Sequence, residues 1–288
     1  MPRYVGRFAP SPTGRLHFGS LFGAVISYLH ARVNSGSWLV RIEDIDPPRE
    51  QEGAARDILA CLEAHGLKAD KPALYQSTAH TRYEDKLEQL RKVSATYQCP
   101  CSRKQLQESG GHSADCINQS RLQLPCATRF KSKNQHYQWH DLYQGDQDRV
   151  LDEDFVLKRK DGLYAYQLAV VSDDMAQGVT HVIRGSDLID STPMQLAIYE
   201  ALETPPPIYG HFPVLVNQHG QKLSKQNLSK EIKVEQAINN LMDVMTLLGV
   251  SLPCSPLNAQ EILSYAERHW QQDNLMHRLS LIAPKAYC

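Results

Sequence analysis

The chain begins with two short apolar segments that alternate with two amphipathic ones, and this order constrains the fold more than any other feature. Residues 3–9 predict a strand, and after a Pro–Gly turn residues 16–34 carry apolar side chains at helical spacing. Residues 37–46 predict a second strand, which a Pro–Pro pair ends, and residues 55–67 a second helix. Strand, helix, strand in this order predicts a right-handed βαβ unit, and we therefore expect an α/β fold with a doubly wound parallel sheet.

Two polar motifs follow these strands, and ligands of such sheets bind beyond the carboxyl ends of the strands. One is the turn at residues 10–14 (PSPTG), and the other is an acidic cluster that contains Glu43. Backbone N–H groups at the turn and at the start of the next helix favour phosphate, to which His17 can donate. Gly19 would let a ligand approach the backbone closely. Taken alone, the motif is equally consistent with a Pro/Gly loop that carries a surface histidine.

A second motif, KLSK at residues 222–225, follows a later predicted strand. Lys222 and Lys225 can neutralise the charge that develops on a leaving pyrophosphate, and one preorganised donor of this kind is worth about 2.7–4 kcal/mol. An isolated KxSK is more often a solvated loop. Together with HFGS at residues 17–20, however, it resembles the paired signature of class I aminoacyl-tRNA synthetases.

Four further segments narrow this resemblance. Residues 7–14, 41–46, 166–171 and 183–188 resemble, in order, the catalytic domain of glutamyl-tRNA synthetases. The resemblance implies a Rossmann-type domain that binds L-glutamate and ATP with Mg²⁺. It implies catalytic roles for His17, Gly19, Lys222 and Lys225. It implies glutamate contacts from Arg7, Ala9, Ser11, Glu43, Tyr166 and Arg184. It implies ATP contacts from Pro10, Thr13, His17, Gly19, Asp187 and Lys225.

The residue types suit these roles. Arginine forks match carboxylates, so Arg7 and Arg184 are the candidates to hold the amino acid. Glu43 can pair with the ammonium group of glutamate, and the Tyr166 phenol can orient the substrate. Each has an ordinary alternative: Glu43 with Arg41 could form a surface pair worth about 0–1 kcal/mol, and Tyr166 could belong to the core.

The chain of 288 residues leaves about 60 after Lys225, where glutamyl-tRNA synthetases carry a large anticodon-reading region. In this the chain resembles the glutamyl-Q tRNA(Asp) synthetase family, to which residues 38–50 and 222–227 are also similar. The resemblance implies activation of glutamate without tRNA, and transfer of the glutamyl group to queuosine in the anticodon of tRNA(Asp). The alternatives are a truncated glutamyl-tRNA synthetase that charges a tRNA 3′ end and a non-catalytic synthetase-like binding protein.

The motifs divide the expected fold into four parts. Residues 1–75 form the first half of the catalytic domain, and residues 76–165 an inserted subdomain. Residues 166–226 form the second half, which ends in the KLSK loop, and residues 227–288 a helical C-terminal region.

Cysteines cluster in the expected insertion, which holds four of the seven. Cys99, Cys101, His112 and Cys116 have a spacing that suits tetrahedral structural zinc, and the resemblance implies a zinc site in this insertion. Cys126 competes with His112 for the fourth position. The other interpretation is a loop that carries several reduced thiols.

Composition sets broader limits. With 42% hydrophobic and 22% charged residues the chain is globular, which excludes a fibre or global disorder. No apolar run approaches the roughly 20 residues that span a membrane, and residues 1–10 do not resemble a signal peptide, so we expect a cytoplasmic protein. We also expect a monomer, although none of these features determines the oligomeric state. The net charge of −1 requires any RNA-binding surface to be local, and residues 129–133 and 158–160 are the densest basic clusters.

Overall fold

The structure is a computed structural model that describes residues 3–102, 104–106, 125–223, 230–255 and 257–287. Its centre is built from parallel strands. These are β1 (Val5–Phe8), β2 (Ser37–Ile42), β3 (Leu74–Tyr75), β9 (His181–Gly185) and β10 (Ile208–Phe212). β2 pairs with β1 and β3, and β9 pairs with β10. The N–H of Thr180 donates to the carbonyl of Val5 at 2.9 Å, which places β9 beside β1 and confirms the expected parallel α/β architecture.

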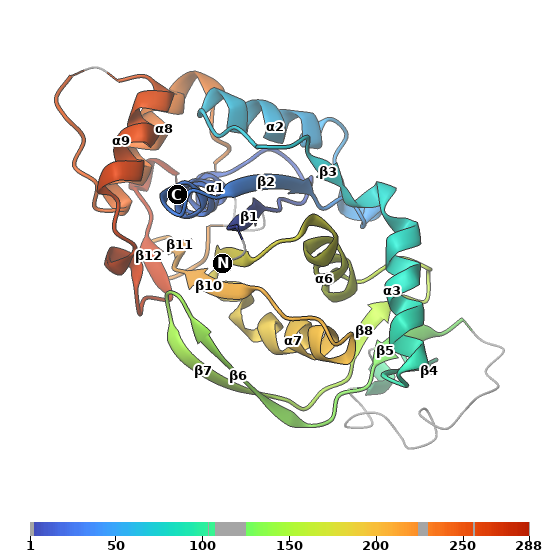
Figure 1. Cartoon of the computed structure of the whole chain (residues 1–288). Coiled ribbons are helices and arrows are strands. Elements are labelled where there is room, and N and C mark those ends of the chain that lie inside the picture. Colours follow the sequence, from blue (N-terminus) through green and yellow to red (C-terminus); the bar gives the residue numbers. More distant parts are fainter. Residues whose placement is uncertain (1–2, 103, 107–124, 224–229, 256, 288) are drawn as a thin grey trace.

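Helices cover both faces of this central layer (Figure 1). The helices on one face are α1 (Phe18–Val33), α2 (Ala54–Ala64), α8 (Ala237–Leu247) and α9 (Ala259–His269). Those on the other are α6 (Tyr166–Gln177) and α7 (Thr192–Ala201). α1 connects β1 to β2, whereas α7 connects β9 to β10, so the chain winds in opposite directions from the β1–β9 boundary. The carboxyl ends of strands at such a boundary form a crevice that binds ligands.

α1 is the central helix, and its burial explains its composition. Leu21, Val25 and Leu29 are fully buried on one side, and Phe22 and Ile26 are fully buried beside them. Each such side chain stabilises the fold by about 1.5–3 kcal/mol relative to exposure. The packing fixes the first turn of α1 at the carboxyl end of β1.

The expected insertion is more regular than the sequence suggested. It begins with α3 (His80–Lys92) and continues in strands β4 (Thr96–Cys99), β5 (Ala127–Phe130), β6 (Gln135–Asp141), β7 (Gly145–Leu151) and β8 (Phe155–Lys158). The polar, cysteine-bearing pattern of residues 99–150 favours irregular structure, and this interpretation is wrong for the residues that lie in β5, β6 and β7. β6 and β7 form a two-stranded antiparallel ribbon that runs along α7 and β10 (Figure 1). Only Tyr137 and Trp139 alternate with polar residues along β6, and β7 is polar over most of its length, so the pattern is too short to predict the ribbon.

Two other elements differ from the sequence pattern. The run Leu168–Val171 reads as a strand because it is apolar and partly β-branched, yet it lies in α6, where all four side chains are buried. Tertiary packing overrides intrinsic propensity at such positions. The C-terminal region contains α8 and α9 as expected, but also the strand β12 (Ser280–Ile282), which pairs in parallel with β11 (Val214–Val216). No described helix is both long enough and apolar enough to cross a membrane.

Candidate active site

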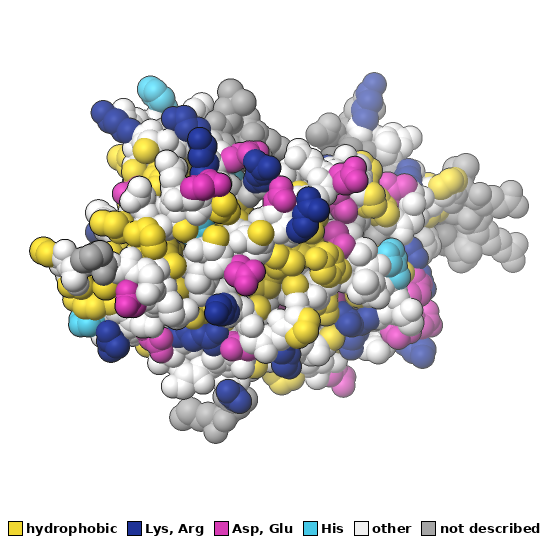
Figure 2. Space-filling model, turned by 90° about the horizontal axis from the view of Figure 1, so that it is seen from above, with side chains coloured by type: hydrophobic (Ala, Val, Ile, Leu, Met, Phe, Trp, Pro, Cys, Tyr) yellow, Lys and Arg dark blue, Asp and Glu magenta, His cyan; other side chains and the backbone are white. Residues whose placement is uncertain are grey.

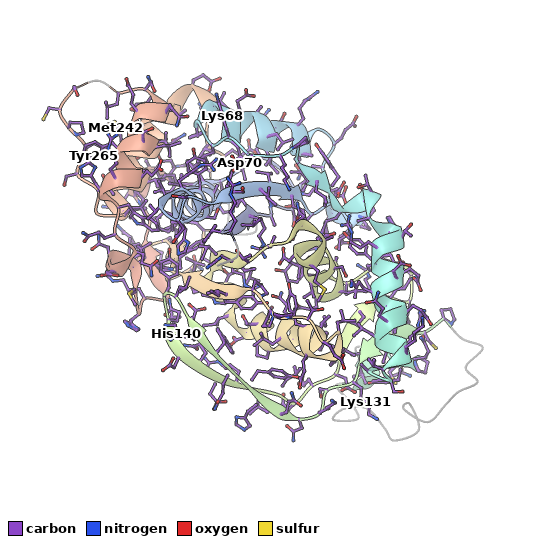
Figure 3. The ribbon with its side chains drawn as sticks, viewed as in Figure 1. Lys68, Asp70, Lys131, His140, Met242 and Tyr265 are labelled. Atoms are coloured by element: carbon purple, nitrogen blue, oxygen red, sulfur yellow. The ribbon has the colours of Figure 1, made fainter. Side chains whose placement is uncertain are left out.

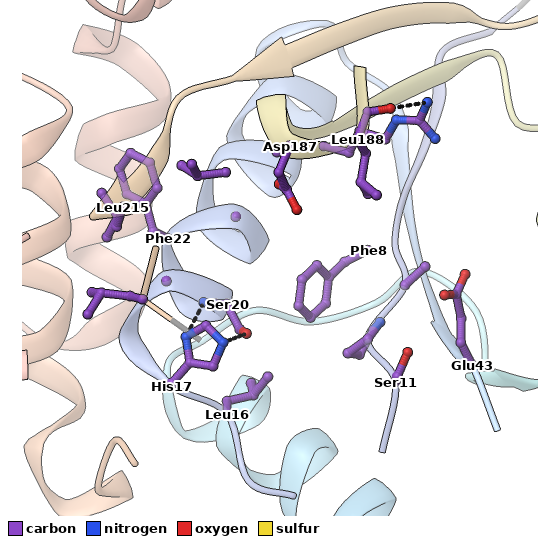
Figure 4. A pocket seen from close by; sticks show the side chains of 18 of the residues that line it. Phe8, Ser11, Leu16, His17, Ser20, Phe22, Glu43, Asp187, Leu188 and Leu215 are labelled. Atoms are coloured by element: carbon purple, nitrogen blue, oxygen red, sulfur yellow. Dashed lines mark hydrogen bonds between the residues drawn. The ribbon is translucent and has the colours of Figure 1, made fainter. Parts of the chain in front are cut away.

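A cavity of about 620 Å³ opens at the carboxyl ends of β1 and β9. Among its lining residues are all of the predicted glutamate, ATP and catalytic residues that the structure describes: Arg7, Ala9, Pro10, Ser11, Thr13, His17, Gly19, Glu43, Tyr166, Arg184, Asp187 and Lys222. Lys225 lies outside the described residues. Residues from four distant segments thus share one pocket. Figure 4 shows His17 and Glu43 on opposite sides of it, with Phe8 between them.

The His17 side of the pocket is the start of α1. His17 is the N-cap residue, and its Nδ1 accepts a hydrogen bond from the N–H of Ser20 at 3.3 Å. Since Nδ1 accepts, a neutral imidazole carries its proton on Nε2, which lies 3.0 Å from Oγ of Ser20 (Figure 4). A Cβ added at Gly19 would lie 3.1 Å from the His17 ring, so the glycine lets the imidazole lie against the helix. A donor at a helix N-terminus is suited to a phosphate.

The KLSK segment begins against this same turn. The Leu223 carbonyl lies 3.5 Å from the position of a Cβ on Gly19, and Ile232 donates its N–H to the carbonyl of Leu16 at 3.1 Å. The described residues on both sides of positions 224–229 therefore contact the start of α1. Lys222 donates to Asp187 at 2.5 Å, and both side chains are partly exposed to the pocket. Lys222 and Asp187, an expected ATP contact, thus form an ion pair with each other.

Glu43, on the other side of the pocket, lies among buried charges. Its carboxylate is 3.6 Å from Nη2 of Arg41, which is fully buried, so the interpretation as an ordinary surface pair is wrong. Burial raises the pKa of Glu43 to about 7, and Arg41 and Arg7 counteract part of that rise. A group that titrates near neutrality in a pocket is a candidate for function.

Arg7 is already paired. Its Nε and Nη2 donate to the two carboxylate oxygens of Asp174 at 3.2 and 3.3 Å, and Asp174 also accepts from Arg41 at 2.7 Å. Burial favours protonation of Asp174, but the two arginines outweigh it and hold its pKa below the ordinary range. Asp174 therefore fixes the Arg7 fork in the pocket wall and compensates much of its charge.

Arg184 is equally buried but has different neighbours. Its guanidinium donates to Oε1 of Gln195 at 2.8 Å, to Oγ1 of Thr192 at 2.9 Å and to Nε2 of His211 at 2.9 Å. No carboxylate lies within ion-pair distance of it among the described residues. A buried cation held only by neutral acceptors is strongly suited to receive a carboxylate from a ligand.

The remaining predicted residues complete the wall. Tyr166 is half-buried, lines the pocket and packs against the buried cluster formed by residues of α3, α6 and α7. Burial raises the pKa of its phenol, which stays protonated and can donate. Ser11 is exposed at the rim, in the turn that follows β1.

Only some of the predicted zinc ligands lie among the residues that the structure describes. Cys99 is buried at the end of β4 and pairs with Ala127, so that Cys99, Cys101 and Cys126 lie at the same end of the β4–β5 pair. His112 and Cys116 fall outside the described residues. Within the described part of the chain, no group of three or more His, Cys, Asp or Glu could hold a metal ion.

Several charged residues at this site were not anticipated from the sequence. Asp174 and its neighbour Asp173 are buried on α6, and Asp173 pairs with Arg82 and accepts from Tyr83 at 2.8 Å. A signal did exist, because two consecutive carboxylates after the apolar run of residues 168–171 need buried partners. Their partners lie far away in sequence, so only the fold identifies them.

Comparison with protein families agrees with this geometry. The model of the family "tRNA synthetases class I (E and Q), catalytic domain" matches residues 4–282. A glutamyl-Q tRNA(Asp) synthetase of Vibrio cholerae is 42% identical over 285 residues, which cover 96% of this chain and 94% of that protein. The protein of the same name from Serratia proteamaculans is 43% identical over 282 residues, covering 96% and 93%.

Solved structures show the same fold at lower identity. A glutamate tRNA ligase from Elizabethkingia meningosepticum, in complex with its amino acid, has a TM-score of 0.79 and 23% identity. The match covers 99% of this chain and 68% of the ligase. An arginyl-tRNA synthetase structure from Campylobacter jejuni, described as putative, is more distant, with a TM-score of 0.52 and 14% identity.

Proposed function

The chain belongs to the glutamyl-Q tRNA(Asp) synthetase family of class I synthetases, and we propose that it activates L-glutamate with ATP and transfers the glutamyl group to queuosine in the anticodon of tRNA(Asp). The observation that carries the proposal is the single pocket in which the His17 turn faces Arg184 and Glu43. The turn suits phosphate, and the arginine and glutamate suit the two charge types of an amino acid. Identity of 42–43% to glutamyl-Q tRNA(Asp) synthetases, against 23% to a glutamate tRNA ligase, supports queuosine as the acceptor.

In the first step, a carboxylate oxygen of glutamate attacks the α-phosphorus of ATP and pyrophosphate leaves. Arg184 and Arg7 hold the carboxylates, Glu43 binds the ammonium group, and Ser11 and Tyr166 orient the substrate by hydrogen bonds. Pro10, Thr13 and Asp187 contact the nucleotide. Mg²⁺ that enters with ATP neutralises phosphate oxygens. The residues act by positioning and electrostatics, and no covalent bond to the enzyme is needed.

Charge on the leaving pyrophosphate is stabilised by His17 and by the lysines of the KLSK loop. Since Lys222 is paired with Asp187, ATP has to separate the two or bind across them. In the second step, a cyclopentene hydroxyl of queuosine attacks the acyl carbon of the adenylate, and AMP leaves.

The activation step is tested by glutamate-dependent exchange of pyrophosphate into ATP without tRNA. The expected result is exchange by the native protein and a loss of about 10²–10³ in rate for Lys225→Ala. Exchange by the native protein that Lys225→Ala left intact would contradict the assigned role of the loop.

The acceptor is tested with labelled glutamate, ATP and tRNA(Asp) that either contains or lacks queuosine. We expect label only on the queuosine-containing tRNA, and on the anticodon fragment after nuclease digestion. Equal labelling of both tRNAs, or label on the 3′ end, would instead identify an enzyme that charges the acceptor end.

We also propose a structural zinc ion in the insertion, bound by Cys99, Cys101, Cys116 and either His112 or Cys126. Cys99, Cys101 and Cys126 lie at the same end of the β4–β5 pair, which fits part of a tetrahedral set. Zinc there would order a polar segment that has little core of its own. Metal analysis of protein prepared without chelators should give about one zinc per chain, and less than about 0.2 would reject the site.

A further inference from the structure

Arg184 is held on the side away from the pocket by a histidine. Its Nε donates to Nε2 of His211 at 2.9 Å, and the hydroxyl of Thr192 lies 3.3 Å from the same ring nitrogen. Both Arg184 and His211 are almost inaccessible to solvent. Because a guanidinium can only donate, this contact requires that Nε2 of His211 carries no proton.

Asp141 meets this requirement from the other side of the ring. One of its carboxylate oxygens accepts from Nδ1 of His211 in a short hydrogen bond. The other accepts three backbone N–H groups, from His211 at 2.9 Å, Gln144 at 3.0 Å and Tyr143 at 3.1 Å. A carboxylate with so many donors stays ionised and keeps the imidazole proton on Nδ1, which leaves Nε2 as an acceptor.

The ionisation of each group fits this arrangement. Burial and the adjacent Arg184 outweigh the attraction of Asp141, so the pKa of His211 lies below its ordinary value and the ring is neutral at pH 7. Burial acts to raise the pKa of Asp141, but the hydrogen bonds from His211 and the backbone lower it below its ordinary value.

The fold brings the three residues together from separate segments. His211 is the register partner of Arg184 in the parallel pair of β9 and β10, so their side chains point to the same face. Asp141 is the last residue of β6, and the next residue, Leu142, donates its N–H to the carbonyl of Tyr209 at 3.0 Å. The ribbon of the insertion therefore reaches the edge of the catalytic sheet and contributes a carboxylate behind the pocket.

We propose that Asp141 and His211 are positioning residues that hold the Arg184 guanidinium in the orientation that binds a carboxylate of the amino-acid substrate. They act through one contact, in which the neutral His211 ring accepts a hydrogen bond from Nε of Arg184. This inference rests on the proposed activation of glutamate. The acceptor is neutral, so it orients the arginine without cancelling the charge that the substrate carboxylate needs. An ionised carboxylate in the same place would compete with the substrate, as Asp174 compensates Arg7.

Two substitutions of His211 distinguish the roles of its two ring nitrogens. In His211→Gln the side-chain oxygen can replace Nε2 as the acceptor for Arg184, whereas in His211→Asn the amide can replace only Nδ1 and donate to Asp141. We expect His211→Asn to raise the KM for glutamate about 10- to 100-fold, the range for a hydrogen bond to a charged group. His211→Gln should raise it by less than about threefold, and the KM for ATP should not change in either variant.

Matched controls are available at His65, another fully buried histidine, which contacts the Cys61 carbonyl at 2.7 Å and Asn240 at 3.1 Å. His65→Asn and His65→Gln should lower stability without changing the KM for glutamate. An equal effect of the two His211 variants on KM, or a KM change in the His65 variants of the same size, would overturn the positioning role.

A measurement on the native protein does not depend on the folding of any variant. Nitrogen NMR of histidine-labelled protein at pH 7 should show His211 neutral with its proton on Nδ1. A proton on Nε2 would overturn the inference. If the native protein shows this tautomer but no glutamate-dependent exchange, the proposed function fails and the geometry of the three residues stands.

Discussion

Glu43 is the residue whose ionisation most directly affects the proposed amino-acid site. It lies on the carboxyl side of β2 with its carboxylate near Arg41 and Arg7, and burial still raises its pKa to about 7. An ammonium group that binds here favours the ionised carboxylate, so binding lowers the pKa of Glu43 from this raised value. Glutamate binding is therefore coupled to loss of a proton from Glu43.

This coupling predicts a pH dependence of the KM for glutamate. With a pKa of about 7, the ionised fraction of Glu43 rises about tenfold between pH 6 and pH 8, and the KM should fall by about the same factor. Glu43→Gln should have a higher KM that is flat across this range. The KM for ATP serves as the control, and a KM for glutamate that is constant or rises with pH in the native protein would contradict the role of Glu43.

At the residue scale, the sequence identified the side chains that face the pocket but not those behind them. Arg7, Glu43 and Arg184 belong to segments that resemble a known family, so their positions could be predicted. Asp174 and His211 are not among the residues that line the pocket. They act on arginines that are 167 and 27 residues away in the chain, and only the parallel register and the placement of α6 bring them together.

At the scale of elements, the first turn of α1 links helix packing to phosphate binding. Gly19→Ala adds a methyl group 3.1 Å from the His17 ring, tight enough to displace the imidazole by a few tenths of an ångström. Alanine in a helix also restricts the unfolded chain, which stabilises a protein by about 0.4–1 kcal/mol. We expect stability to stay equal or rise while pyrophosphate exchange falls about tenfold or more, because small misplacements of catalytic groups are costly.

Thermal denaturation and exchange rates measured on the same preparation check this prediction. Exchange at the native rate in Gly19→Ala would show that the reaction does not depend on the position of the His17 imidazole, and the assigned role of His17 in charge stabilisation would then be wrong.

α6 is tied to the sheet by Asp174, which bridges Arg7 on β1 and Arg41 on β2. Asp174→Asn leaves two buried guanidinium groups without their shared counter-charge, and breaking a buried pair costs about 3–5 kcal/mol. We expect the free energy of unfolding in urea to fall by about this amount. Asp57→Asn is the control, since its pair with Arg15 is exposed and solvent screening leaves it with little effect on stability.

The ion pairs of Asp174 also determine the direction in which the free energy of unfolding changes with pH. The folded-state pKa of Asp174 lies below its unfolded value of about 3.9, so its contribution is complete above that pH and is lost as the pH falls through the folded pKa. The stability difference between the native protein and Asp174→Asn should therefore be constant at neutral pH and shrink in acid. A difference that stayed constant down to pH 2 would show that the charge of Asp174 contributes nothing.

α1 and the strands β1 and β2 were predictable, although α1 and β2 are buried on almost every side. The apolar residues of α1 recur at helical spacing over 16 residues, and a Pro–Gly turn and a Pro–Pro pair end the two strands. α6 is buried over residues 168–174 and has no such periodicity, so its apolar run resembles a strand. The β6–β7 ribbon could not be predicted for the opposite reason, because most of its residues on both faces are polar.

At the scale of the whole molecule, the two basic clusters of the sequence differ from what their composition suggests. Lys158 pairs with Glu84 at 2.7 Å, and Arg159 pairs with Asp46 and Asp161. Arg129 is buried. On the face shown in Figure 2, basic and acidic side chains are interspersed and no single sign dominates, in accordance with the net charge of −1. Much of the basic character of these clusters is therefore neutralised within the protein.

Lys160 donates to the Pro100 carbonyl and forms no ion pair among the described residues, and Lys131 and Lys133 are two further exceptions in these clusters. Both are exposed between β5 and β6, and neither forms an ion pair among the described residues; Figure 3 shows Lys131 at the outer edge of the molecule. Unpaired lysines at an edge are suited to RNA phosphates, whose neutralisation releases counterions and makes binding salt-dependent.

We therefore predict that the double variant Lys131→Ala, Lys133→Ala binds tRNA(Asp) more weakly and with a smaller salt dependence. Each lost phosphate contact reduces the slope of log affinity against log salt by about 0.7–0.9, so the pair should reduce it by about 1.4–1.8. Filter binding or fluorescence titration between 50 and 200 mM salt measures the slope, and tRNA-independent pyrophosphate exchange should not change. Lys158→Ala is the control because its charge is already paired with Glu84, and it should leave the slope intact. If the double variant kept the native slope, the tRNA surface would lie on another face of the protein.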